Sequence, residues 1–193
     1  DGTASGIGAL PTTTLAFESV FNSGEITVRG GQLATGIDYR AFSFGDNVLV
    51  NSGSITVSDD TAARDSAAIR FDTDGGMQLW NSGTISGDYA ILRNSLIFGG
   101  DPDPKQRQSA EIYNSGTMDG AVDLFRDDET YYIDFIFVNS GSITGDVRFS
   151  IGNDLFDGRG GTVGTVDGGY GHDTILTGLG AQTLIGGVGR DFL

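Results

Sequence analysis

Apolar and polar positions alternate in short runs along this chain, around one phrase that occurs five times. The phrase is Asn-Ser-Gly, one further residue, and then Ile or Met. An apolar residue stands two positions before each Asn, and the Ile or Met stands four positions after it. Side chains at even spacing share one face of a strand, so both residues are expected to point inward from two short strands. The inward residues are Val20 and Ile26, Leu49 and Ile55, Leu79 and Ile85, Ile112 and Met118, and Phe137 and Ile143.

The phrase recurs at a spacing that indicates stacked coils. Successive Asn residues are 29, 30, 33 and 25 positions apart, and periods of this size are typical of solenoid proteins. The Gly of each phrase suits a tight corner because glycine accepts a positive φ. The sequence therefore predicts an all-β fold, a parallel β-solenoid with three short strands in each coil of 25–33 residues. The third strands are expected at 41–44, 68–71, 90–92, 121–124 and 146–149.

The five asparagines would lie in register in such a solenoid. Because each occupies an inward position, their amides are expected to bond one another along the axis as a ladder. The residue before each Asn points outward, and an exposed apolar stripe of this kind marks a contact surface. A long loop folded over the stripe is the alternative explanation. The ladder residues are Asn22, Asn51, Asn81, Asn114 and Asn139, and the stripe residues are Phe21, Val50, Trp80, Tyr113 and Val138.

A different pattern begins at Phe149. Residues 168–176 read Gly-Gly-Tyr-Gly-His-Asp-Thr-Ile-Leu, and residues 186–193 match the first eight positions of the same nonapeptide pattern. Residues 151–157 match its second half, because Phe149 and Ser150 stand where the glycine pair belongs. Nonapeptide repeats of this type form a parallel β-helix. With two nonapeptides in each coil, the C-terminal coils are expected to be narrower than the upstream ones.

The aspartates of the three copies are evenly spaced. Asp154, Asp173 and Asp191 are 19 and 18 residues apart, which predicts that they stack along one edge of the narrow coils. This part of the chain resembles the calcium-binding RTX (hemolysin-type) repeats of secreted bacterial proteins. The upstream repeats, residues 15–149, resemble those of bacterial autotransporter-like surface β-solenoids.

The RTX resemblance implies that the solenoid continues into a parallel β-roll with Ca²⁺ as its cofactor. In that family the ion lies between loops of successive coils, held by Asp oxygens and backbone carbonyls, which are ligands that calcium prefers. Two sites are implied, one on each side of the Asp173 loop. The metal-site residues would be Gly152, Asn153, Asp154, Gly169, Gly171, Asp173, Gly187, Gly189 and Asp191.

The chain thus divides into three expected regions. Residues 1–20 form a partial first coil or cap, residues 21–148 form the five-repeat solenoid, and residues 149–193 form the β-roll, which is expected to continue beyond the end of the chain. The roll has few apolar residues for its core. They are Leu155, Phe156, Val163, Ile175, Leu184, Ile185 and Phe192.

Composition and charge exclude several functions. The formal net charge of −15 argues against nucleic acid and against an anionic membrane surface as partners. The chain has no apolar run long enough to span a membrane. The absence of cysteine excludes disulfides and thiol catalysis. The one histidine, His172, stands at a variable position of the nonapeptide and is expected to be a loop residue rather than a catalytic base.

Three functions are compatible with these observations. The leading one is a non-catalytic, calcium-stabilised module of a bacterial cell surface or secreted protein: part of an adhesin, a surface layer or a filament. Its partner would be a second copy, side by side or end to end, or a cell-surface or polysaccharide ligand. The first alternative is a polysaccharide lyase, epimerase or glycosidase with paired acids, because β-helices host such enzymes. The candidate acids are Asp72 with Asp74, and Asp101 with Asp103 beside Lys105.

The second alternative is an ice-binding solenoid. Outward residues on either side of each inward Ile or Met would stack into two hydroxyl-rich rows, although acids interrupt both rows. The rows are Glu25, Ser54, Thr84, Thr117 and Ser142, and Thr27, Thr56, Ser86, Asp119 and Thr144.

Overall fold

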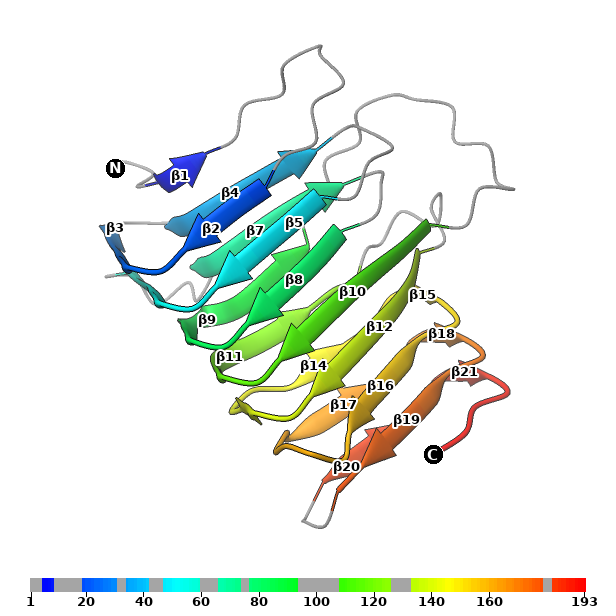
Figure 1. Ribbon diagram of the computed structural model, residues 1–193. Coiled ribbons are helices and arrows are strands. Elements are labelled where there is room, and N and C mark those ends of the chain that lie inside the picture. The colour runs from blue at the N-terminus through cyan, green and yellow to red at the C-terminus, as the bar shows by residue number, and fades with distance from the viewer. Residues whose placement is uncertain are drawn as a thin grey trace.

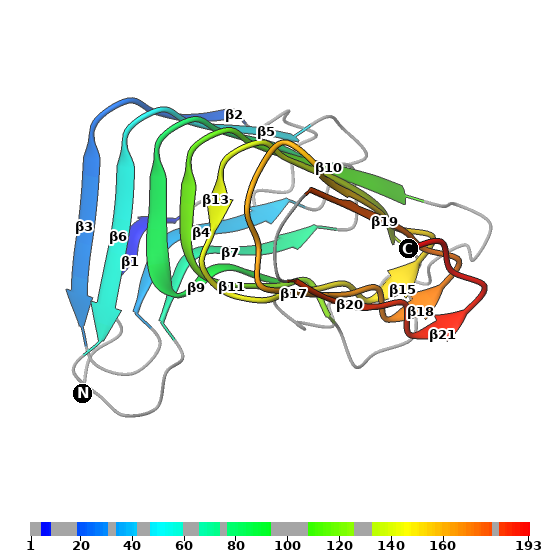
Figure 2. The same cartoon turned by 90° about the horizontal axis from the view of Figure 1, so that it is seen from below.

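Parallel strands stack coil upon coil into one continuous solenoid in this computed structural model (Figures 1 and 2). The structure describes residues 5–8, 19–30, 34–41, 47–59, 66–73, 77–93, 108–125, 133–178 and 182–193. These residues form strands, turns and bends. Within those ranges, no helix has the length and apolarity that crossing a membrane requires. The predicted all-β parallel solenoid is confirmed.

The first of three sheets carries the strand that precedes each Asn-Ser-Gly corner. Its neighbouring strands are parallel, and the five phrase asparagines pair in one row at their ends. In spatial order, the strands are β2 (Ser19–Asn22), β5 (Asn47–Asn51), β8 (Met77–Asn81), β10 (Gln108–Asn114), β12 (Ile133–Asn139), β16 (Leu155–Gly158) and β19 (Thr174–Thr177).

The second sheet follows the corner and contains 11 strands. The strand β1 (Ser5–Gly8), from the expected N-terminal partial coil, pairs with β4. The main path is β1, β4 (Thr35–Ala41), β7 (Ala67–Thr73), β9 (Thr84–Arg93), β11 (Thr117–Asp123), β14 (Val147–Arg148), β17 (Thr165–Asp167) and β20 (Thr183–Ile185). The strands β3 (Glu25–Gly30), β6 (Ser54–Asp59) and β13 (Ser142–Ile143) pair beside this path.

A third sheet closes the narrow C-terminal coils. It contains β15 (Ile151–Gly152), β18 (Tyr170–Gly171) and β21 (Val188–Gly189). Ile136 pairs with Leu155 and Val147 with Val166, so the first two sheets run from the wide coils into the narrow ones without a break.

The core lies between the sheets and consists of the residues that the repeat pattern places inward. Leu49, Leu79, Ile112 and Phe137 are 0–1% exposed. Val20 and Ile26 in the first coil are only partly buried. Where wide coils meet narrow ones, Phe137, Phe149 and Phe156 pack edge to face, with ring centroids 5.3–6.5 Å apart.

The asparagine ladder forms along the first sheet. The Nδ2 of Asn22 donates to Oδ1 of Asn51 at 2.7 Å, and the pattern continues through Asn81 and Asn114 to Asn139 with bonds of 2.8 Å. The amides of Asn22, Asn51 and Asn81 also donate to a backbone carbonyl of the following coil, and Asn139 ends the ladder on the carbonyl of Thr162 at 3.0 Å. All five are at most 8% exposed. The buried asparagine amides therefore satisfy one another by hydrogen bonds from coil to coil.

The glycines of the corners allow successive coils to approach. A Cβ on Gly83 would collide with the carbonyl oxygen of Gly53 below it, and the same holds for Gly116 above Gly83. The space between coils, rather than a positive φ, requires glycine at these corners.

Two details differ from the expected strand pattern. The third strand of the first coil is Thr35–Ala41 instead of 41–44, because Ile37 and Tyr39 pair with Ile69 and Phe71. Ala41 ends this strand, and 42–44 lie outside the described residues. In the third and fourth coils the second and third strands merge into β9 and β11, whose pairing shifts register between Asp119 and Val122. These coils therefore have two long strands rather than three short ones.

The core of the narrow coils also differs from expectation. Phe156, Val163 and Ile175 are buried as expected, and Val166, which the pattern did not single out, is fully buried. Ile185 and Phe192 are 43% and 63% exposed because alternation turns them outward. Leu155 faces outward for the same reason, and Leu184 is only partly buried.

The ladder predicts a position-dependent loss of stability. Asn81→Ala removes two amide-to-amide bonds and leaves buried partners on both sides, whereas Asn22→Ala removes one bond at the end of the row. We expect Asn81→Ala to lower the free energy of unfolding by about 1–3 kcal/mol and Asn22→Ala by clearly less, measured by urea denaturation. Equal losses at the two positions would contradict a cooperative ladder.

Candidate functional site

The glycine-rich loops of the C-terminal coils lie in register at one edge of the solenoid (Figure 1). Gly152, Gly171 and Gly189 form one row of the third sheet. The loop glycines Gly169 and Gly187 have φ of 86° and 91°, in the left-handed region that favours glycine. The sequence folds this way because only residues without a Cβ both adopt this φ and fit against the coil below.

The three aspartates stack along this edge, each bonded to the coil before it. The Oδ1 of Asp154 accepts the backbone N–H of Phe135 at 2.7 Å. The Oδ1 of Asp173 accepts the N–H of Asp154 at 2.8 Å, and that of Asp191 accepts the N–H of Asp173 at 3.1 Å. Asp173 therefore connects the two loops on either side of it.

A second column of side chains runs beside the aspartates and bonds in the opposite direction. Asp134 accepts the backbone N–H of Asn153 at 2.7 Å, and Asn153 accepts that of His172 at 3.0 Å. His172 then accepts the N–H of Arg190 through Nδ1 at 3.0 Å. Each narrow coil is thus joined to the next by two antiparallel side-chain bonds. This arrangement also gives His172 a structural role.

The second carboxylate oxygen, Oδ2, of Asp154 and of Asp173 has no hydrogen-bond partner among the described residues. Asp154 and Asp173 are 3% and 1% exposed, and their Oδ2 atoms make no hydrogen bond to the described residues. A Cβ on Gly168 would lie 2.6 Å from Oδ2 of Asp173, and one on Gly186 equally close to Oδ2 of Asp191. The glycine pairs before Asp173 and Asp191 therefore leave the space into which the Oδ2 atoms of these two residues point.

Burial opposes ionisation of these carboxyls. It raises the pKa of Asp154 to about 8 and that of Asp173 to about 6, despite the hydrogen bonds from the backbone. The charges of Asp173 and Asp134 add to the rise in the pKa of Asp154, and those of Asp191 and Asp134 add to the rise in the pKa of Asp173. Arg93 lies buried near the first aspartate, with Cζ 5.7 Å from the ring centroid of Phe135, and its charge offsets part of the rise at Asp154. Ionised aspartates at this edge need a positive charge close to them.

The donor set fits a calcium ion. Calcium takes oxygen ligands only and accepts backbone carbonyls beside carboxylates, and this edge offers two buried, unpartnered carboxylate oxygens among glycine loops. Within the described ranges no three Asp, Glu, His or Cys side chains converge on one point. Backbone carbonyls would therefore have to supply most of the ligands.

The first of the two expected sites departs from the nonapeptide pattern in its structure as well. Phe149, in the place of a glycine, is buried against the rings of the core, and Ser150 is 3% exposed. The loops of Asp173 and Asp191 both have the glycine pair. The second expected site, between these two loops, therefore keeps the nonapeptide pattern on both sides.

Comparison with other proteins adds nothing to this picture. No known protein family, curated protein or solved structure matches the chain. The resemblances to RTX and autotransporter-like repeats therefore stay predictions that rest on the residues.

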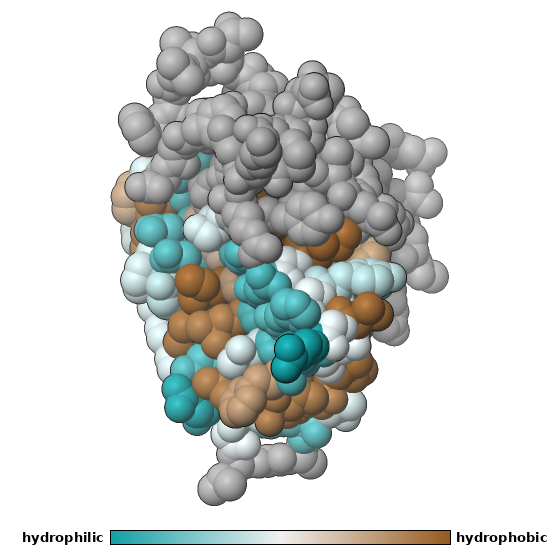
Figure 3. Space-filling view, turned by 90° about the vertical axis from the view of Figure 1, so that its right-hand side faces the viewer, coloured by the Kyte–Doolittle hydropathy of each residue, from teal (hydrophilic) through white to brown (hydrophobic). Residues whose placement is uncertain are grey.

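The outer side of this edge carries exposed apolar residues as well. Tyr170 and Val188 are 48% and 64% exposed. Figure 3, which looks toward this side, shows hydrophobic residues flanking a hydrophilic band.

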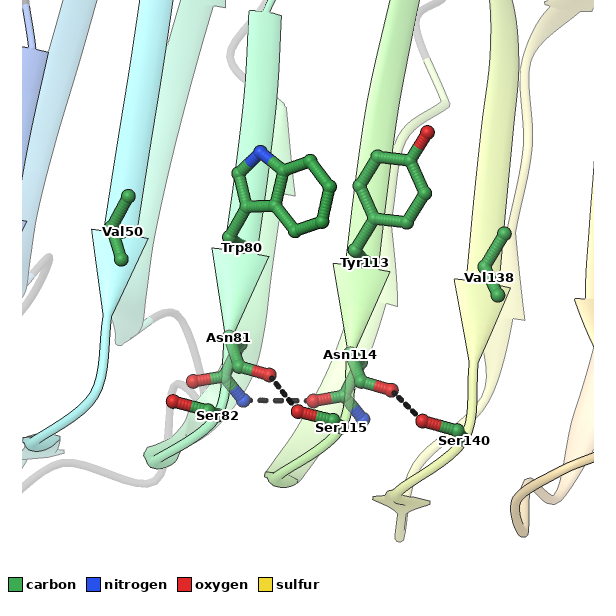
Figure 4. Close-up of a pocket in the computed structure, with 9 residues that line it drawn as sticks. All are labelled: Val50, Trp80, Asn81, Ser82, Tyr113, Asn114, Ser115, Val138 and Ser140. Atoms are coloured by element: carbon green, nitrogen blue, oxygen red, sulfur yellow. Dashed lines mark hydrogen bonds between the residues drawn. The ribbon is translucent and has the colours of Figure 1, made fainter.

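The stripe residues point outward from the first sheet, as predicted from their place before each Asn (Figure 4). Phe21 and Trp80 are 73% and 45% exposed, and the other three are partly buried. The rings of Trp80 and Tyr113 stack with centroids 4.1 Å apart and planes inclined by 15°. A groove of about 390 Å³ surrounds them, from Val50 to Val138 and down to the corner serines.

The candidate acids of the enzyme alternative have no described side chains. Asp72 lies in β7, but its side chain, together with Asp74, Asp101, Asp103 and Lys105, falls outside the described residues. In the hydroxyl-rich rows, Asp119 accepts hydrogen bonds from Ser86 and Thr144, which interrupts a uniform hydroxyl surface.

The aspartate stack predicts a difference between two substitutions at Asp173. Asp173→Asn keeps an Oδ1 acceptor for the N–H of Asp154 and removes the buried charge, whereas Asp173→Ala removes the bond as well. In EGTA we expect Asp173→Asn to protect residues 149–193 from protease at least as well as wild type. Asp173→Ala should lose about 1–3 kcal/mol of local stability. If both variants behave alike, the bond to Asp154 does not stabilise the loop.

Proposed function

We propose that the chain is a non-catalytic, calcium-stabilised β-solenoid that serves as a structural or adhesive module of a secreted or cell-surface bacterial protein, such as an adhesin, a surface layer or a filament. The observation that carries the calcium part is the pair of buried, unpartnered Oδ2 atoms of Asp154 and Asp173, together with the glycine pairs that precede Asp173 and Asp191. A buried carboxylate without a partner is costly, and a cation removes that cost.

Side chains and backbone carbonyls would both supply ligands to the ion. Asp154, Asp173 and Asp191 would supply carboxylate oxygens, and the glycine loops would supply backbone carbonyls. Calcium, when bound, would supply the positive charge that lets neighbouring aspartates ionise together. The backbone bonds to Oδ1 hold each carboxylate in place from the coil before it. Calcium outside the cell is abundant enough for weak sites of this type, which supports an extracellular location.

The shape supports a structural role. Seven strands of the first sheet stack in parallel, at about 4.8 Å per strand, so the described coils form a rod whose side faces are sheets (Figure 1). One of these faces carries the exposed apolar stripe. A rod with a contact face spaces and joins other components, which is what an adhesin or a surface layer requires.

Calcium should control the order of the C-terminal coils. We expect residues 149–193 to become resistant to limited proteolysis as calcium is titrated into metal-free protein, while the strands β5, β6, β8 and β9 of the upstream coils stay resistant throughout. At a calcium concentration ten times the dissociation constant, each site adds roughly 1.4 kcal/mol. Equal resistance in EGTA and in millimolar calcium would show that the aspartates only form turns.

Substitutions at the three aspartates should separate calcium binding from folding. Asp173→Ala should reduce calcium protection more than Asp154→Ala or Asp191→Ala, because Asp173 bonds to the loops on both sides. Asp173→Asn is the matched control, since it keeps the hydrogen bond but lacks the charge. A variant Asp173→Asn that gains as much protection from calcium as wild type would contradict a metal role for this residue.

The enzyme and ice-binding alternatives have direct tests. We expect no turnover of alginate or pectin, with or without calcium, because the proposed role is non-catalytic. Turnover that is lost on substitution of Asp72 or Asp101 would replace the proposed function. We also expect no thermal hysteresis, since Asp119 interrupts the hydroxyl rows.

A further inference from the structure

We propose that the groove beside Trp80 and Tyr113 binds a neutral, extended β-1,4-linked glycan. The inference deepens the adhesive role proposed above and rests on it. The groove spans four coils along the solenoid axis and lies on the first sheet (Figure 4). Its volume of about 390 Å³ falls in the range of ligand sites.

The aromatic pair supplies an apolar surface that no described residue of the chain covers completely. Trp80 remains 45% exposed although it stacks on Tyr113. Val50 and Val138, one coil away on either side, are smaller, so the pair stands above its neighbours and has space on both sides. A β-linked sugar ring presents an apolar face of C–H groups, which packs against such a surface.

Hydrogen-bonding groups line the corner side of the same groove. Ser82, Ser115 and Ser140 are exposed at successive corners. The hydroxyls of Ser115 and Ser140 donate to the carbonyls of Asn81 and Asn114 at 3.3 Å (Figure 4). These bonds orient the hydroxyls and leave their oxygens free to accept from a ligand hydroxyl. An apolar ring beside a row of acceptors matches a sugar, which has both kinds of surface.

The charge of this face favours a neutral ligand over an anionic polymer or a second copy of the chain. The groove residues are all uncharged, while the chain carries a net charge of −15. Glu111 lies next to the groove and accepts from the Tyr113 hydroxyl at 3.0 Å and from Gln78 at 3.4 Å. An anionic polymer would be repelled. A second copy docked on this face would bring the Glu111 carboxylates of two chains, each with a net charge of −15, toward one another.

The register of the coils favours an extended polymer. Each coil presents one outward residue and one serine at the same two positions, repeated at the strand spacing of about 4.8 Å. A linear β-1,4 glycan likewise presents one ring and its hydroxyls at every step. A helical α-1,4 glycan does not keep its rings in line with such a row.

Trp80 is the only tryptophan of the chain, so its fluorescence reports on the groove directly. Cellohexaose titrated into the calcium-loaded full chain should change the emission of Trp80 to saturation, and maltohexaose should not. Calorimetry should show that Trp80→Ala weakens cellohexaose binding by about tenfold or more. Trp80→Phe keeps an aromatic ring and should stay within about threefold of wild type.

The matched control is Thr56→Ala, an exposed residue of the second sheet away from the groove, which should leave binding unchanged. Circular dichroism and urea midpoints establish that each variant is folded. The proposal fails if folded wild type gives neither a fluorescence change nor heat with cellohexaose. It also fails if Trp80→Ala binds as wild type does. Cellohexaose-independent dimerisation that Trp80→Ala abolishes, seen by sedimentation, would assign the groove to a second copy instead.

The same measurements distinguish this inference from the calcium proposal. The groove lies between Val50 and Ser140, upstream of the aspartate loops, and its binding is expected to persist in EGTA. Loss of calcium protection with glycan binding intact overturns only the calcium sites. Calcium protection without glycan binding overturns only the glycan site.

Discussion

In-register parallel stacking is the constraint on which the rest of this structure depends. Each residue meets its own counterpart one coil away, at a fixed spacing, so the interaction of a side chain with itself is repeated along the axis. Asparagine suits this geometry because its amide both donates and accepts, and five copies satisfy one another in a buried row. Isoleucine and leucine suit it because identical apolar side chains pack above one another.

Aspartate does not suit the same geometry, since an ionised carboxylate accepts but cannot donate. The aspartate row therefore bonds the backbone of the preceding coil through Oδ1 and leaves Oδ2 of Asp154 and Asp173 without a partner. In the wide coils the stacked polar side chains are amides, which satisfy one another by hydrogen bonds within the protein. The narrow coils present a stack of carboxyls that ionise together only beside a positive charge, which an external cation would supply. The contrast between the two rows explains why one half of the molecule is expected to need metal and the other is not.

The sequence predicted the features in which the same residue type recurs in every repeat. It failed where equivalent positions of successive coils carry different residue types. The corner phrase placed the ladder, the inward residues and the stripe, because Asn, Gly and Ile recur at fixed offsets. The third strand of the first coil was misplaced because Gly36 stands where other coils have Ala, while the small residue Ala41 offered a false match. The column of hydrogen bonds through Asp134, Asn153, His172 and Arg190 was missed because these residues differ in side-chain type and share only their position in successive coils. Ile185 and Phe192 were wrongly placed inside because short strands carry too few residues to show alternation.

The direction of the asparagine ladder has a consequence for the length of such a molecule. Every amide of the ladder donates toward the C-terminal side, each one after Asn22 accepts from the amide of the preceding coil, and the last one ends on the carbonyl of Thr162. A coil with one asparagine therefore offers the same two groups to its neighbours whatever coils lie above and below. Whole coils can be gained or lost by duplication or deletion without leaving an unpaired amide at the junction. The length of the solenoid can therefore change in units of one repeat, while the surface residues of each repeat vary independently.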